Sequence, residues 1–280
     1  MRTSSKAKEI PMTEPDPILV SVDDNIATIQ MNRPEVMNAL STPLVTALRD
    51  ALADLRRNKD VRALVLTGSG RAFSAGADLN DPIMSLDAPR EERGQRFRTV
   101  MDTQINAMMR DLYSFDRPKI AAVNGAAAGG GVGLALTMDI VIASKSAYFM
   151  QVFAPALNLV PDLGCTWHLA HQLGRARALG LAMTGERLVA EKAEEWGLIW
   201  RCVEDDELAT TVRDLARKLA AGPTRALAAT PAIIDAAQLS SFTAQLDMER
   251  DVQSALVQTS DFEEAVAAFL AKRKPEFTGL

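Results

Sequence analysis

Apolar and polar positions along the chain form patterns that predict strands in five segments. Residues 18–23 and 26–31 are short β-rich runs with only an Asp and an Asn between them, a spacing that predicts a hairpin. Residues 63–68, 120–123 and 139–144 are nearly continuous apolar runs, as expected for parallel strands buried on both faces. Because helical segments separate these runs, the pattern predicts an α/β fold with crossover connections.

A helical period predicts the elements between the strands. Apolar residues recur at spacings of three and four from Leu44 to Leu55 and form a stripe that faces a core. Ser41 or Thr42 suits the cap of this helix, and Pro43 suits its first turn. A polar and charged stretch over residues 90–113 is predicted to be a second helix.

The last quarter of the chain has a different character. Residues 206–280 are rich in Ala, Leu, Glu and Arg with few candidate strands, which predicts a helical region that caps the core or makes subunit contacts. Residues 1–17 are polar with three prolines and are expected to form a mobile tail. The α/β core is therefore expected to span residues 18–205. Breaks between the C-terminal helices are expected at Gly222-Pro223, Thr230-Pro231 and Ser240-Ser241.

Composition narrows the class of protein. The 280 residues carry a net charge of −5, which disfavours a nucleic-acid partner because phosphate backbones are bound by clustered Lys and Arg. Two cysteines, Cys165 and Cys202, are too few for a disulfide framework and favour a reduced, cytoplasmic chain. No apolar run approaches the roughly 18 residues that span a bilayer, so no membrane partner is expected.

Two segments that follow predicted strands are unusually rich in glycine and alanine. They are residues 68–79 and 124–136, and neither has the spacing of a nucleotide-binding motif. Small residues let a ligand approach the backbone, and two such turns on neighbouring strands can aim two N–H donors at one point, as an oxyanion hole does. Tight packing between strand and helix explains the same composition, so both interpretations stay open at this point.

Three motifs favour the first interpretation. FSAGADL at residues 73–79 is followed by AAVNGAAAGGG at 121–131 and by LVPDLGCTW at 159–167. In this order and at these separations they resemble the crotonase superfamily of enoyl-CoA hydratases and isomerases. The C-terminal half is especially similar to its branch of ring-1,2-epoxyphenylacetyl-CoA isomerases. The resemblance implies an α/β spiral of ββα units with a helical C-terminal region. It also implies an acyl-CoA substrate and no cofactor, because coenzyme A is part of the substrate.

The resemblance also implies roles for residues in both turns. The two oxyanion donors fall on the backbone N–H groups of Ala77 and Gly130, which would hold the thioester carbonyl of an acyl-CoA. Arg33 is a weaker candidate for binding the phosphates of coenzyme A. The residues that would line the entry of coenzyme A are Ala75, Gly76, Ala77, Asp78 and Leu79.

One carboxylate is expected to react. Hydratases of the resembled family use two glutamates, but this chain has Gly133 and roughly Phe153 at those positions. Asp162 matches the single catalytic carboxylate of several family isomerases, and its apolar sequence neighbours are expected to raise its pKa. Asp139 is expected to be a polar strand end.

Other chemically active residues are expected to be structural. His168 and His171 lack a third ligand, which favours a helix face over a metal site, and no metal is expected. Cys165 is expected to be a buried thiol. The resemblance suggests a homotrimer or hexamer in which Lys272 or Phe277 touches coenzyme A on a neighbouring subunit.

A lone carboxylate beside an oxyanion hole suits a proton shuttle better than the addition of water. The leading hypothesis is therefore an isomerase that shifts a double bond or ring epoxide of an acyl-CoA through Asp162. The alternatives are an enoyl-CoA hydratase, or another enolate reaction, and a catalytically silent family member that binds coenzyme A. One departure bears on all three: the segment before Pro161 is one residue longer than the family spacing, which affects the orientation of Asp162 and the residue assignments from Phe153 to Asn158.

Overall fold

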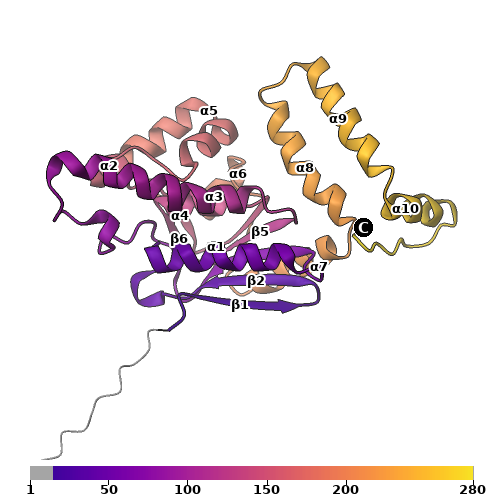
Figure 1. The fold of residues 1–280 in the computed structure, drawn as a ribbon, viewed down its shortest axis with the longest axis horizontal. Coiled ribbons are helices and arrows are strands. Elements are labelled where there is room, and N and C mark those ends of the chain that lie inside the picture. The colour runs from indigo at the N-terminus through magenta and orange to yellow at the C-terminus, as the bar shows by residue number, and fades with distance from the viewer. Residues whose placement is uncertain (1–14, 280) are drawn as a thin grey trace, which may run out of the picture.

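The computed structural model describes residues 15–279 (Figure 1). Its strands form two sheets. The strands are β1 (Ile18–Asp23), β2 (Ile26–Met31), β3 (Ala63–Gly68), β4 (Ala72–Ser74), β5 (Lys119–Val123), β6 (Ala126–Ala128), β7 (Ile140–Ser144), β8 (Tyr148–Met150), β9 (Leu188–Val189) and β10 (Arg201–Val203). The larger sheet has the order β1-β2-β3-β5-β7-β10 and is parallel except for the β1–β2 hairpin. The smaller sheet has the order β4-β6-β8-β9.

Helices connect and cover the strands. The α-helices are α1 (Thr42–Arg57), α2 (Arg90–Val100), α3 (Asn106–Tyr113), α4 (Gly130–Leu136), α5 (Cys165–Thr184), α6 (Ala190–Glu195), α7 (Leu208–Ala220), α8 (Thr224–Ala237), α9 (Phe242–Leu256) and α10 (Ser260–Leu270). Short 3-10 turns span Pro34–Val36 and Pro82–Met84, and π-helical turns span Met101–Ile105 and Phe153–Leu157. Within residues 15–279, none of the helices has both the length and the apolar character that crossing a bilayer requires.

The larger sheet is buried on both faces, which explains its continuous apolar strands. Alternate residues of β2, β3, β5 and β7 pack against α7 through Val212 and Ala216. The residues between them face a larger core that α1, α3, α4 and α5 complete. The five strands predicted from sequence are confirmed, with ends shifted by at most one residue.

The two predicted helices between strands are confirmed as well. Ser41 caps α1 by accepting the Leu44 N–H at 3.5 Å, and Pro43 lies in the first turn. The apolar stripe of α1 is buried against the larger core. The charged stretch over residues 90–113 forms α2 and α3, joined by the π-helical turn Met101–Ile105.

The smaller sheet is not predicted by the sequence pattern. β4 lies inside the segment 68–79 and β6 inside 124–136, both of which are expected to be turns. These strands are three residues long and β6 consists of alanine, so neither carries the alternating pattern by which a strand is recognised. β4 pairs with β6 in parallel, and this pairing determines where the following turns lie.

Only the end of the predicted N-terminal tail falls in the described part of the chain, since residues 1–14 lie outside it. The carbonyl of Asp16 accepts the side-chain N–H of Asn32 at 3.1 Å, and the carbonyl of Pro17 accepts its backbone N–H at 2.8 Å. From Asp16 onwards the chain is therefore held against the end of β2.

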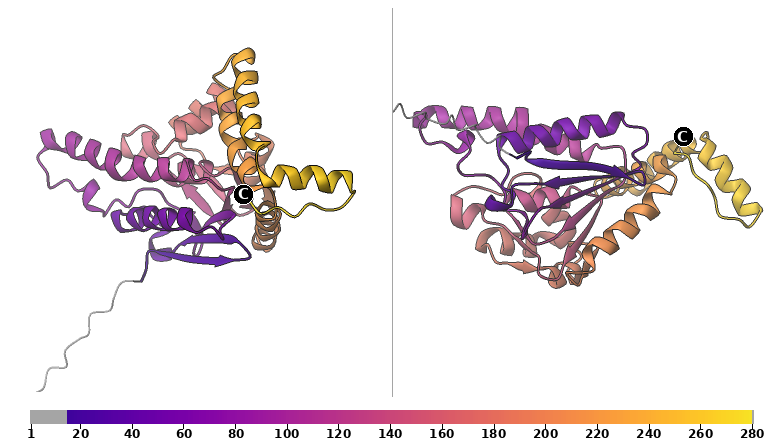
Figure 2. Two further views of the ribbon diagram at one scale, coloured as in Figure 1. Left: turned by 45° about the vertical axis from the view of Figure 1, so that its right-hand side comes forward. Right: turned by 90° about the horizontal axis from the view of Figure 1, so that it is seen from below.

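The C-terminal region is helical, as predicted, and α8 to α10 project from the core (Figures 1 and 2). The breaks predicted at Gly222-Pro223 and Ser240-Ser241 are confirmed. The break predicted at Thr230-Pro231 is wrong, because α8 runs through Pro231. Pro231 lacks the N–H that would donate to the Leu227 carbonyl one turn earlier, yet the helix continues through it to Ala237.

Arg62 joins this region to the core. Its guanidinium donates to the Thr224 hydroxyl at 3.0 Å, the Phe277 carbonyl at 2.7 Å and the Gly222 carbonyl at 2.6 Å. Because Arg62 directly precedes β3, an inner strand of the larger sheet, these bonds fix the start of α8 and the segment after α10 against the N-terminal end of that strand.

We expect Arg62→Met to lower the free energy of unfolding by about 2–4 kcal/mol, because three acceptors lose a charged donor while the apolar stem is kept. Urea unfolding measures the change. Arg57→Met is the matched control: the Arg57 side chain is 72% exposed in its pair with Asp54, so its loss should cost less than about 1 kcal/mol. Equal effects of the two substitutions would contradict the role given to Arg62.

Candidate active site

The two glycine-rich turns are in direct contact because β4 and β6 are neighbours. A Cβ atom on Gly76, which follows β4, would lie 3.0 Å from the backbone nitrogen of Gly130 and 2.7 Å from the carbonyl oxygen of Ala128. Gly76 also has a φ of 83°, which side chains disfavour. Both the space and the backbone at this position therefore require glycine.

A backbone bridge orients the first turn. The Leu40 N–H donates to the Gly76 carbonyl at 2.7 Å, and the Leu40 carbonyl accepts the Asp78 N–H at 3.0 Å. In this parallel bridge the N–H of Ala77, between them, points away from Leu40. Gly130 is the first residue of α4, where a backbone N–H has no acceptor within the helix. Within residues 15–279, neither of these two N–H groups donates a hydrogen bond to the protein.

Asn38 is a residue of this site that sequence analysis missed. Its buried side chain donates to the carbonyls of Ser69 at 2.9 Å and Ala72 at 2.8 Å and accepts the Arg33 N–H at 2.9 Å. Its own carbonyl accepts the Ser74 hydroxyl at 2.9 Å. Asn38 therefore ties the segment before α1 to both ends of β4 and positions the turn that follows. The only sequence signal was a polar residue within an apolar stretch.

Arg33 and Asp78 hold the same turn from its other side. Nη1 of Arg33 donates to Asp78 Oδ2 at 2.9 Å and to the Ala39 carbonyl at 2.8 Å. The Asp78 side chain is 9% exposed, whereas Leu79 is 54% exposed at the surface. The Arg33 side chain is 24% exposed, so it is partly open to solvent beside the turn. Binding of coenzyme A phosphates by Arg33 stays a prediction.

Asp162 lies in the loop before α5, and this loop rests on α4. A Cβ atom on Gly130 would lie 3.0 Å from Cδ2 of Leu163. Leu163, which follows Asp162, therefore contacts Gly130, whose N–H is the second free donor. Oδ1 of Asp162 is buried and has no hydrogen-bond partner. Burial raises the pKa of this carboxyl to about 6, and a hydrogen bond from its own backbone opposes the shift. Such a carboxyl can accept and return a proton near neutral pH.

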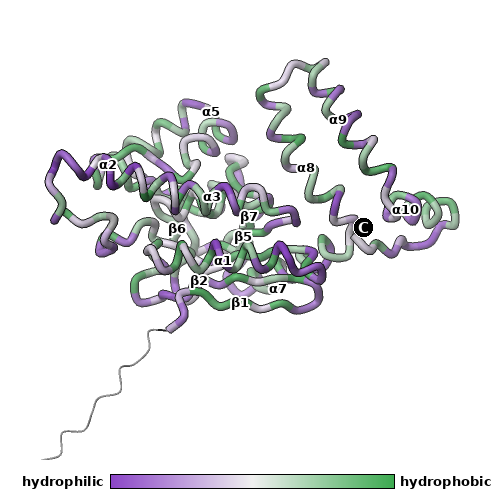
Figure 3. Tube along the Cα trace, viewed as in Figure 1, coloured by the Kyte–Doolittle hydropathy of each residue, from purple (hydrophilic) through white to green (hydrophobic). Residues whose placement is uncertain are grey.

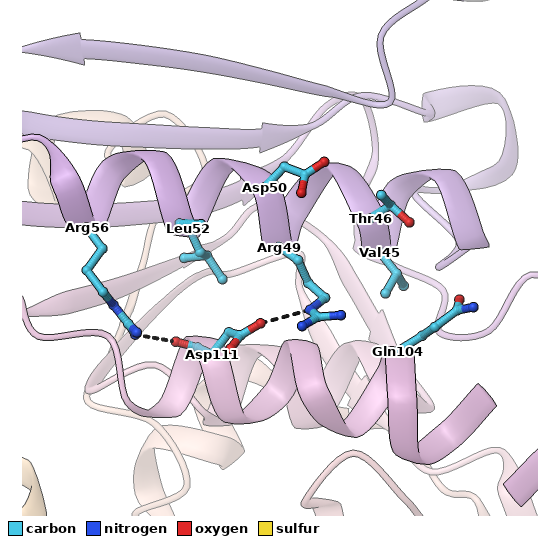
Figure 4. A pocket seen from close by; sticks show the side chains of 9 residues that line it. Val45, Thr46, Arg49, Asp50, Leu52, Arg56, Gln104 and Asp111 are labelled. Atoms are coloured by element: carbon cyan, nitrogen blue, oxygen red, sulfur yellow. Dashed lines mark hydrogen bonds and ion pairs between the residues drawn. The ribbon is translucent and has the colours of Figure 1, made fainter. Parts of the chain in front are cut away.

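One of the larger cavities reaches this loop. It has a volume of about 760 Å³ and is lined by Leu163, Gly164 and residues of α3, α5 and α8. A second cavity, of about 1200 Å³, lies between the core and α8. A third, of about 340 Å³, lies between α1 and α3, where Arg49 and Asp111 pair at 2.8 Å (Figure 4). None of the predicted site residues lines this third cavity.

Comparison with known proteins identifies the family to which the chain belongs. Residues 21–280 match the family described as enoyl-CoA hydratase/isomerase. The chain is 44% identical over 262 residues to 1,2-epoxyphenylacetyl-CoA isomerase of Escherichia coli (strain K12), which covers 94% of this chain and 98% of that protein. It is 43% identical to a probable enoyl-CoA hydratase of Rhodobacter capsulatus, with the same coverage of 94% and 98%. The chain belongs to the enoyl-CoA hydratase/isomerase family.

The fold is that of the family, the crotonase fold, as predicted. A crystal structure of enoyl-CoA hydratase from Bacillus anthracis superposes with a TM-score of 0.84 at 30% identity. The superposition covers 94% of this chain and all of that one (100%).

No carboxylate occupies the two positions at which sequence analysis placed the glutamates of family hydratases. A Cβ atom on Gly133 would lie 2.2 Å from the carbonyl oxygen of Leu163, so no side chain fits there while the loop keeps its place. Phe153 is buried, and its Cζ lies 3.7 Å from the position a Cβ atom would take on Gly129. An aromatic ring therefore packs beside the glycine triplet where the second glutamate is expected.

The extra residue before the Pro-Asp pair lies in the region of the π-helical turn Phe153–Leu157. The Phe153 carbonyl accepts the N–H of Asn158, five residues further on. One residue inserted into a helix produces this geometry. Asn158 then turns the chain with a φ of 55°. The π-helical turn thus lies within the segment whose residue assignments the extra residue affects, and the loop that carries Asp162 rests on α4.

The remaining candidates make structural contacts. Asp139 pairs with Lys119 at 2.7 Å; burial raises the pKa of Asp139 and Lys119 opposes that shift. Burial raises the pKa of Cys165 to about 12, which keeps the thiol protonated and confirms it as a buried structural residue. His171 is exposed, with Nδ1 2.7 Å from the carbonyl of Trp167. The contact of Lys272 or Phe277 with coenzyme A on a neighbouring subunit stays a prediction.

We expect Gly133→Ala to destabilise the protein by about 1–3 kcal/mol, because the added methyl group meets the Leu163 carbonyl and the loop must move. Gly180→Ala in α5 is the matched control, since no heavy atom lies within 4 Å of its Cβ position. Helix propensity predicts a gain of up to about 1 kcal/mol there. Thermal and urea unfolding measure both. A Gly133→Ala protein as stable as the control would show that this contact does not hold the loop.

Asp162 should make the folded protein less stable as the pH rises. Because burial raises its pKa from 3.8 to about 6, the folded protein holds the proton more tightly than the unfolded chain does between these values. The stabilisation is complete below the unfolded pKa and is lost as the pH rises through about 6. Asp162→Asn should therefore match the parent near pH 4 and exceed its stability by about 3 kcal/mol at pH 8.

Urea unfolding of parent and variant across this pH range gives the difference in their free energies of unfolding. The contributions of the other titrating groups are common to both proteins and cancel. Asp206→Asn, an exposed substitution, is the control and should leave the difference flat. An Asp162→Asn protein that is no more stable than the parent at pH 8 would mean that the carboxyl is not desolvated.

Proposed function

We propose that the protein is an acyl-CoA isomerase that shifts a double bond or a ring epoxide by enolate-stabilised proton transfer. The observation that carries this proposal is Asp162, a partly buried carboxyl whose Oδ1 is buried without a hydrogen-bond partner, on a loop in contact with Gly130. Asp162 would remove a proton from one carbon of the thioester substrate and return it to another. A pKa of about 6 suits both steps near neutral pH.

The free N–H groups of Ala77 and Gly130 would stabilise the intermediate. Removing a proton beside a thioester moves negative charge onto the carbonyl oxygen, and two pre-positioned donors would hold that oxygen. Loss of one such donor typically costs about 3–4 kcal/mol of transition-state stabilisation. The exposed position of Ala77 leaves the turn open to a ligand, which supports the assignment of Ala75 to Leu79, with Arg33, to coenzyme A.

Two observations favour isomerisation over hydration. Adding water across a double bond is helped by a second acid or base, and Gly133 has no space for a side chain. The position of the second glutamate holds Phe153, whose ring is buried. The name of the Escherichia coli relative, 1,2-epoxyphenylacetyl-CoA isomerase, supports the same choice and a ring-bearing acyl group. The name of the Rhodobacter capsulatus relative supports the hydratase alternative.

The C-terminal helices support assembly into a homotrimer or hexamer as part of this proposal. They expose large apolar side chains that a lone chain leaves in water, and Figure 3 shows apolar positions along α8 and α10. Leu239 and Phe242 are each 80% exposed, and Phe269 is 83% exposed. A cytoplasmic location stays a prediction from the cysteine content.

We expect Asp162→Asn to lower isomer formation at least about a hundredfold and to leave acyl-CoA binding nearly intact, because asparagine keeps the size of the side chain but cannot carry the proton. The measurement uses enoyl-, dienoyl- and epoxide-bearing CoA thioesters in D2O. Product mass and position report isomerisation, and calorimetry reports binding. Deuterium uptake should fall with turnover.

The outcomes separate the alternatives. Conversion of an enoyl-CoA to a 3-hydroxyacyl-CoA by the parent identifies a hydratase instead. Binding without turnover or deuterium exchange identifies a silent family member. An Asp162→Asn protein that keeps more than about a tenth of the parent's turnover would place the base elsewhere. Glu186→Gln, at an exposed position after α5, is the control and should leave turnover unchanged.

A further inference from the structure

His168 is a buried histidine next to the loop that carries Asp162. It is the fourth residue of α5 and is 6% exposed. Its backbone N–H donates to the Gly164 carbonyl at 3.0 Å, and its ring atom Cδ2 lies 3.4 Å from the position a Cβ atom would take on Gly164. The edge of Trp167 packs on the ring at 4.8 Å between centroids. The imidazole of His168 therefore packs against Gly164, the last residue of the loop that carries Asp162.

The hydrogen bonds of Thr137 determine which nitrogen of His168 carries the proton. The Thr137 hydroxyl donates to the Gly133 carbonyl at 2.8 Å, and Nε2 of His168 lies 3.3 Å from the same hydroxyl oxygen. Because the hydroxyl proton is already used, its oxygen accepts, and Nε2 must donate. Nδ1 is then an unprotonated nitrogen, buried without a partner. Burial lowers the pKa of His168 to about 4, so the ring is neutral at neutral pH.

This bond fixes the loop at a second point on α4. The first point is the contact of Leu163 with Gly130 and Gly133 in the first turn of α4. The second is the bond from His168 to Thr137, the residue that ends α4. Since α4 is one short helix, two attachments along it leave residues 163–168 little freedom to slide. Asp162 directly precedes the first attachment, and its carbonyl accepts the Cys165 N–H at 2.9 Å, which ties it to this held segment.

We propose that His168 is a positioning residue that holds the Asp162 carboxyl at a fixed place relative to the Gly130 N–H, by binding Thr137 across the end of α4. The inference rests on the proposed function, since it concerns the same site. An apolar side chain would fill the same space without making the bond. A misplacement of about 1 Å at a reacting group typically costs about a hundredfold in rate.

The groups that face His168 come from several elements. Asp235 of α8 and His171 of α5 act on its charge. The cavities that it lines also contain Arg110 and Tyr113 of α3, and the pair of Lys119 and Asp139. In the described part of the chain, Thr137 is the residue whose side chain bonds to the ring.

Four variants test the proposal. His168→Leu and Thr137→Val each remove the bond and are expected to lower kcat by about tenfold to a hundredfold, with KM and binding of an unreactive CoA thioester changed less than about threefold. His168→Gln presents an amide N–H close to the place of Nε2 and should stay within about threefold of the parent. His171→Leu, one turn further along α5, is the control and should match the parent.

Two further readouts separate positioning from simple loss of stability. The double variant His168→Leu with Thr137→Val should be no slower than either single variant, because both remove one bond. A 13C titration of Asp162 should show its pKa moving from about 6 toward 3.8 in His168→Leu, as the loosened loop admits water. This titration needs no turnover.

The contrary results are specific. A His168→Leu protein with kcat within about twofold of the parent and an unmoved Asp162 titration overturns the proposal. So does an equal loss in His168→Gln and His168→Leu, which would mean that the bond to Thr137 is not what the site requires. Asp162→Asn, run in parallel, keeps the two ideas apart: if it retains turnover the proposed function fails, and if it is inactive while His168→Leu is normal only the positioning role fails.

Discussion

The site depends on the close packing of one loop against one helix. Leu163 lies on the face of α4 formed by Gly130 and Gly133, at a distance that leaves no room for a side chain at Gly133. This contact brings the loop that carries Asp162 next to the free N–H of Gly130, with Oδ1 of the carboxyl buried. It also explains why a single carboxylate is present, since the glycine that admits the loop excludes a second acid on that face.

The same packing links reactivity to stability. A carboxyl without a hydrogen-bond partner for Oδ1 is unfavourable when charged, so burial of Asp162 raises its pKa and costs folding free energy at neutral pH. The loop has further strain, because Leu163 adopts a φ of 47°, a conformation that favours glycine. Such costs persist when surrounding contacts over-determine the conformation. Here those contacts are the glycine face of α4 and the bond from His168 to Thr137.

The other half of the site is built by backbone hydrogen bonds. The smaller sheet sets β4 beside β6, and Leu40 bonds to both neighbours of Ala77, so the two free N–H groups come from adjacent turns. Asn38 anchors this arrangement through buried side-chain bonds. The larger sheet, buried on both faces, supplies the rigid base, and Arg62 attaches the C-terminal helices to the N-terminal end of its inner strand β3.

Local patterns in the sequence determined the five predicted strands, the cap of α1 at Ser41, the helical C-terminal region and the motifs that contain Ala77, Gly130 and Asp162. Periodicity and short motifs are readable because their residues are neighbours in the chain. Only the tertiary structure showed the smaller sheet, the role of Asn38, the steric exclusion at Gly133 and the bond from His168 to Thr137. Each of these is a contact between segments distant in sequence, and no local pattern encodes a distance between two chain segments until the core has brought them together.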